Sequence, residues 1–147
     1  MESRTAASAS EFAEYVEKYS ENILTLCSLL LGQGSEAETA AVKSFTELYV
    51  PYLRKGCCPQ SFSILAYRAC IRHCSRIAQD RKACLAACLP WEDQVVHALR
   101  YGMRLPLTEI SEILMKSLPE LKAQLRQMRE LLAAHEATLP TSNLSAG

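Results

Sequence analysis

Four cysteines are spaced in a way that suits chemistry at sulfur. Cys70 and Cys74 are four residues apart, as are Cys84 and Cys88, so each pair would lie one turn apart on a helix. Four thiolates on facing helices could bind zinc or copper, because soft ligands select soft ions, or could be oxidised to a disulfide-linked hairpin. The alternative, which we favour, is that they are small core residues and that the protein needs no cofactor.

Three arginines follow the same helical spacing. Arg68, Arg72 and Arg76 are four residues apart and would form one stripe along a helix. Aligned guanidiniums repel one another unless an anionic group lies along them, and a nucleic-acid backbone or an acidic partner would serve. The alternative is a solvated face that is neutralised by glutamates from the N-terminal region.

The charge of the chain is segregated although its net charge is zero. Residues 1–53 carry three basic and eight acidic residues, whereas residues 54–82 carry seven basic residues and a single acid. A globally basic, histone-like protein is excluded, but a local basic surface is not.

Enzymatic motifs are absent from the sequence. There is no phosphate-binding glycine loop, no nucleophile elbow and no His-Glu-x-x-His motif. No secretory signal is visible, and the longest apolar stretch, 23–31, is too short to span a bilayer. We therefore expect a cytoplasmic protein with reduced thiols and no membrane contact, which is not an enzyme.

Apolar residues recur at three- and four-residue spacing, and no strand-like alternation is present. The pattern predicts an all-α protein with six helices, at about 12–31, 36–49, 61–79, 90–102, 106–114 and 117–132. Pro51 and the turn at 56–59 are expected to end the second helix. Two small helical lobes, 8–80 and 83–136, would be followed by a disordered tail, 137–147.

The last two helices have the spacing of a helix-turn-helix: Leu107–Leu114, a short turn, and a second helix that Ser117 and Glu120 begin as a capping box. The start of the second helix would meet the major groove. There Lys122, Arg126 and Arg129 could hold phosphates, and Gln124 could read the edge of an adenine. The alternative is an ordinary hairpin of two helices.

The second half resembles the C-terminal domain of bacterial RNA polymerase sigma factors, most closely the small extracytoplasmic-function group. The similarity lies in Leu89-Pro90, in the runs 95–102 and 109–114, and in Leu121-Lys122. The first half is similar more loosely, in the helix 12–31 followed by Gly32, in the segment from Glu36-Ala37-Glu38 to Phe45, and in Phe62 with Tyr67-Arg68.

The resemblance implies a function and a set of partners. It implies that Glu36, Glu38 and Phe45 bind the polymerase core, that the arginine stripe and Phe62 face promoter DNA, and that an anti-sigma factor is a possible partner. It also places Met115 where the family has a left-handed glycine. Two alternatives stay open: a sigma mimic or adaptor that binds proteins without reading DNA, and a cysteine-based metal or redox sensor.

Overall fold

The computed structural model describes residues 9–55, 59–81 and 89–138, and within these ranges the chain is helical and contains no strand. The all-α prediction is confirmed. The elements are α1 (Ala9–Leu31), α2 (Ser35–Lys55), α3 (Pro59–Arg81), α4 (Trp91–His97), the π-turn η2 (Ala98–Gly102), α5 (Leu107–Leu114) and α6 (Leu118–Thr138). Of the predicted tail, residues 137 and 138 belong to α6, and 139–147 lie outside the described residues.

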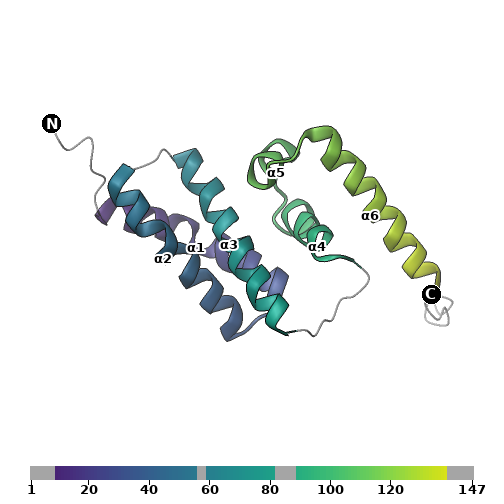
Figure 1. The fold of residues 1–147 in the computed structure, drawn as a ribbon, viewed down its shortest axis with the longest axis horizontal. Coiled ribbons are helices and arrows are strands. Elements are labelled where there is room, and N and C mark those ends of the chain that lie inside the picture. Colours follow the sequence, from purple (N-terminus) through teal and green to yellow (C-terminus); the bar gives the residue numbers. More distant parts are fainter. Residues whose placement is uncertain (1–8, 56–58, 82–88, 139–147) are drawn as a thin grey trace.

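The first three helices pack side by side and surround an aromatic core (Figure 1). Phe62 of α3 is 1% exposed and lies at its centre, with its ring centroid 4.5 Å from that of Tyr15 and 5.8 Å from that of Phe12. Helix α1 ends where predicted, because Gly32 adopts a positive φ of 88° that side chains disfavour.

The predicted end of α2 at Pro51 is wrong. The helix continues through Pro51 to Lys55, although the proline ring removes one backbone donor from the helix. The final turn carries Tyr52, which is 5% exposed and packs its ring against Phe12, Tyr15 and Phe62. Burial of this ring compensates for the lost hydrogen bond, so the helix persists beyond the proline.

The second half packs against α3 and α1, and its buried residues continue the same core. Val96, Leu99, Ile110, Leu121 and Met128 are each at most 1% exposed and join the cluster that contains Phe62. Figure 1 shows α4 and α5 between α3 and the long α6. The two predicted lobes therefore share one continuous hydrophobic core.

A π-turn interrupts the helix that begins at Trp91. The amide of Met103 donates to the carbonyl of Ala98 over 2.8 Å, which is a bond between residues five apart. The wider turn carries Arg100 and Tyr101 on the side of α6, where both line the same hollow as residues of that helix.

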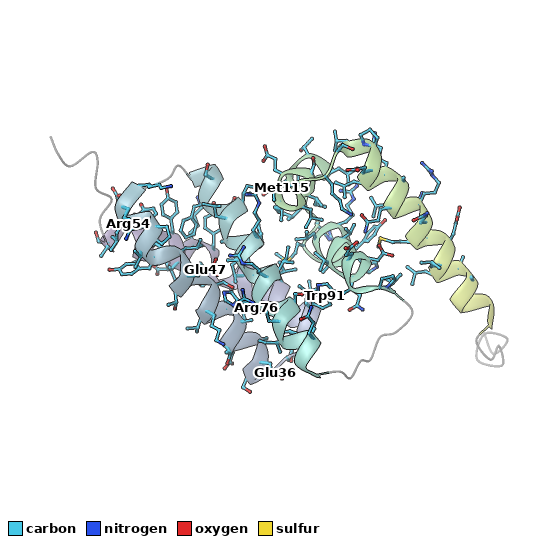
Figure 2. The ribbon with its side chains drawn as sticks, viewed as in Figure 1. Glu36, Glu47, Arg54, Arg76, Trp91 and Met115 are labelled. Carbon is cyan, nitrogen blue, oxygen red and sulfur yellow. The ribbon has the colours of Figure 1, made fainter. Side chains whose placement is uncertain are left out.

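The predicted capping box at the start of α6 is confirmed. The Glu120 amide donates to Ser117 Oγ over 3.2 Å, and the Ser117 amide donates to Glu120 Oε1 over 3.0 Å. Just before it, Met115 adopts φ 57° and ψ 47°, the left-handed conformation expected at this position. Its side chain is 75% exposed and points toward α3 (Figure 2).

In the part of the chain that the structure describes, no helix combines the length and the apolar character needed to cross a bilayer.

We predict that Met115→Gly stabilises the fold by about 1 kcal/mol, because glycine adopts the left-handed conformation without steric cost and little packing is lost from an exposed side chain. Thermal unfolding followed by circular dichroism measures the change. Met115→Ala is the matched control, since alanine removes the side chain but keeps the left-handed penalty. Equal stabilisation by both variants would contradict the conformational explanation.

Candidate functional site

Arg68, the first residue of the arginine stripe, is used inside the protein. Its Nη2 donates to the carbonyl of Glu112 over 2.6 Å and its Nε to the carbonyl of Ile113 over 3.1 Å. These carbonyls belong to the last turn of α5, whose acceptors have no partners within the helix. Arg68 therefore caps α5 from a neighbouring helix and joins the two halves of the chain.

The next arginine of the stripe is paired with an acid. Arg72 forms an ion pair with Glu47 of α2, and Nε2 of His73 lies 2.7 Å from Oε1 of the same carboxylate. Figure 2 labels Glu47 on α2 and Arg76 on α3, and the Arg76 side chain is exposed. The stripe is thus partly neutralised by the acidic N-terminal region, as the alternative interpretation anticipated.

A second basic surface lies on α6. Lys122, Arg126 and Arg129 are all exposed and follow one helical face. Together with Arg100 and Tyr101 of η2 they line a hollow of about 330 Å³, completed by Leu107 and Leu125. We call this the basic hollow. It brings four cations together, and no acidic residue is among the described residues that line it.

Two members of the basic hollow were not found from the sequence. Arg100 is fixed by a hydrogen bond from Nη1 to the carbonyl of Leu105 over 3.0 Å, and Tyr101 is 47% exposed. The π-turn brings them to α6, and nothing in the periodicity of the sequence signals that turn.

Gln124 is separated from the other predicted DNA contacts by its bonds within the protein. Its Nε2 donates to Oδ1 of Asp93 over 2.7 Å, and its Oε1 accepts from Nζ of Lys116 over 2.7 Å. Both ends of the amide are therefore engaged. Gln124 connects the start of α6 to α4 and to the preceding turn, which gives this amide a structural role.

The residues expected to bind polymerase are divided between surface and core. Glu36 and Glu38 lie exposed in the first turn of α2. Phe45 is 8% exposed, and its ring lies parallel to that of Phe62 at 6.4 Å. Phe62 and Tyr67, which the resemblance places near promoter DNA, are also buried. Of these five residues, Glu36 and Glu38 lie on the surface, and the three aromatic residues lie in the core.

The structure describes Cys70 and Cys74, whereas Cys84 and Cys88 lie outside the described residues. Cys27 of α1, which the sequence analysis did not select, lies beside the described pair. The three sulfur atoms are all within 4.8 Å of one another, and Cys27 Sγ lies 3.1 Å from Cys70 Sγ. We call these three residues the trithiol cluster, and each is 0% exposed.

Hydrogen bonding within the trithiol cluster separates the pKa values of its members. The pKa of Cys27 falls to about 4, mainly because its sulfur accepts hydrogen bonds from Cys70 and Cys74, with a smaller contribution from His73. The hydrogen bond to Cys27 raises the pKa of Cys74 to about 12 and likewise raises that of Cys70. The three thiols are thus coupled to one another inside the core.

In comparisons with known proteins, no family model matches the chain and no curated protein matches it significantly.

We predict that Arg68→Ala destabilises the protein by about 1–2 kcal/mol, because it removes two hydrogen bonds from a charged donor to the carbonyl end of α5. Thermal or urea unfolding measures the loss. Arg76→Ala removes the same side chain from an exposed position of the same helix, and we expect a change within about 0.5 kcal/mol. Equal losses for the two variants would exclude the capping role.

Proposed function

We propose that the protein is a sigma-factor-like transcription regulator that binds promoter DNA through the basic hollow and binds the RNA polymerase core through another face. The observation that carries the proposal is the gathering of Arg100, Lys122, Arg126 and Arg129 around one hollow that has no acid among its described lining residues. Four cations at close range repel one another, and a polyanion relieves that repulsion.

The chemistry of the hollow suits a phosphate backbone. Arginine can donate two parallel hydrogen bonds to one phosphate, and lysine adds a mobile point charge. Tyr101 is 47% exposed and lines the same hollow, so its hydroxyl could donate to a phosphate oxygen. Such contacts fix the register of a protein on DNA, but they carry little sequence information.

The helix that presents these cations is held firmly at its start. The capping box fixes the first turn of α6, and Gln124 links α6 to Asp93 of α4 and to Lys116 of the turn. The basic face of α6 is therefore held in a defined orientation. This supports binding of a DNA duplex along α6, in the manner of a helix-turn-helix.

A surface for the polymerase core is proposed at the start of α2, where Glu36 and Glu38 lie exposed on one end of the three-helix half. Strand melting is not part of the proposal, because Phe62 and Tyr67 are buried and Arg68 caps α5.

An adaptor that binds a protein without reading DNA is the second candidate function. It is favoured by the first half of the chain, where the residues that the resemblance assigns to DNA are engaged internally: Arg72 pairs with Glu47, and Arg68 binds the carbonyl end of α5. In this function, the acidic start of α2 would meet a basic partner surface.

We predict that Lys122→Ala and Arg126→Ala each weaken binding to duplex DNA several-fold and similarly for all sequences, because each removes a phosphate contact. In a fluorescence-anisotropy titration across salt concentrations, the slope of log K against log salt should fall by about one per cation removed. Lys43→Ala on α2 removes an exposed positive charge away from the hollow and is the control. Absent or salt-independent binding would refute the DNA proposal.

We predict that the double charge reversal Glu36→Lys and Glu38→Lys abolishes retention of the protein by immobilised polymerase core, because the acidic surface becomes basic. Both residues are exposed, so the fold should be retained, as circular dichroism can verify. The adaptor function would be favoured by two results together. The unmodified protein would fail to bind DNA, and the Lys122→Ala and Arg126→Ala variants would still be retained by the polymerase core. Unchanged retention of the double variant would exclude the start of α2 as the contact.

A further inference from the structure

We propose that the trithiol cluster is a binding site for one copper(I) ion, held in trigonal coordination by Cys27, Cys70 and Cys74. The proposal is independent of DNA binding, because the cluster lies in the core between α1 and α3 and shares no residue with the basic hollow.

The distances between the sulfur atoms suit a trigonal ion. An ion about 2.3 Å from each of three sulfurs in one plane holds them about 4 Å apart. Cys27 Sγ and Cys70 Sγ lie 3.1 Å apart, and all three separations are at most 4.8 Å, so the three sulfurs are close enough to surround one ion. Two of the thiols share one face of α3, and the third comes from α1.

The number of ligands favours copper(I) over zinc. Structural zinc sites are almost always tetrahedral and need four ligands. Among the described residues, the cluster offers three sulfurs and no fourth ligand atom. Soft thiolate sulfur selects copper(I), whose filled d shell tolerates three-coordination.

The trithiol cluster is enclosed within the hydrophobic core. Cys70 Sγ lies 3.9 Å from the carbonyl oxygen of Ile23, so the α3 thiol also contacts the backbone of α1. Ile23 and Leu26, on the same helix as Cys27, are at most 1% exposed and belong to the same hydrophobic core. An ion bound there would cross-link α1 and α3, and its binding energy would add to the stability of the fold.

The test is an anaerobic titration of the reduced full-length protein with copper(I) in competition with a chromogenic copper(I) chelator. We expect one ion per chain, a sulfur-to-copper charge-transfer band and a higher thermal midpoint with copper(I) than without. X-ray absorption of the copper-loaded protein should show three sulfur neighbours. Failure to take copper(I) from the chelator, or a copper site without three sulfurs, overturns the proposal.

Variants assign the ligands. Cys27→Ala and Cys74→Ala should each lower copper(I) affinity by at least about tenfold, the loss that even outer-shell changes cause at metal sites. The control is the double variant Cys57→Ser and Cys58→Ser, which removes two thiols that precede α3 in the sequence. The first residue of α3, Pro59, is about 16 Å along the helix from Cys70. Retained affinity in both alanine variants, or preferred binding of zinc in competition, would refute the assignment. If a variant fails to fold, the X-ray absorption spectrum of the copper-loaded wild-type protein still shows whether three sulfurs bind the ion.

Discussion

The carbonyl groups in the last turn of α5 need hydrogen-bond donors from outside the helix. The residues that supply these donors fix how the two halves of the chain are arranged. A guanidinium from α3 supplies two of those hydrogen bonds. The left-handed turn at Met115 supplies another, because the Lys116 amide reaches back to the carbonyl of Ser111 over 3.1 Å. Since α5 has only eight residues, these bonds help to define where it ends and which side of α3 it touches. The same requirement engages the Arg68 guanidinium within the fold.

Helix α3 divides its faces between two kinds of chemistry. The face toward α1 is apolar and carries two thiols, whereas the face toward α2 and α5 carries the guanidiniums of Arg68 and Arg72. Both sets recur every four residues, offset by two positions, so they point to nearly opposite sides of one helix. A single helical period thus explains why the thiols are dry while the arginines meet acids and carbonyl oxygens.

Much of the fold could be predicted from the sequence because its signals are local. The apolar periodicity gave the helices, Gly32 gave the end of α1, and Ser117 with Glu120 gave the start of α6. The candidate sites were harder because they depend on which helices meet. Cys27 lies within an apolar stripe and is indistinguishable there from any small core residue, until α1 is packed on α3. The partners of Arg72 and Gln124 come from α2 and α4, and no spacing along one helix reveals them.

The π-turn at Ala98–Gly102 makes the composition of the basic hollow depend on chain length. A π-turn contains one residue more per hydrogen-bonded turn than an α-helix does. Deleting one residue there would let the turn close with α-helical bonds and would rotate the following side chains by about 100° around the axis. Different side chains would then face α6, although no residue of the hollow had been substituted. Insertions and deletions at this turn would therefore retune the charge of the surface as effectively as point mutations.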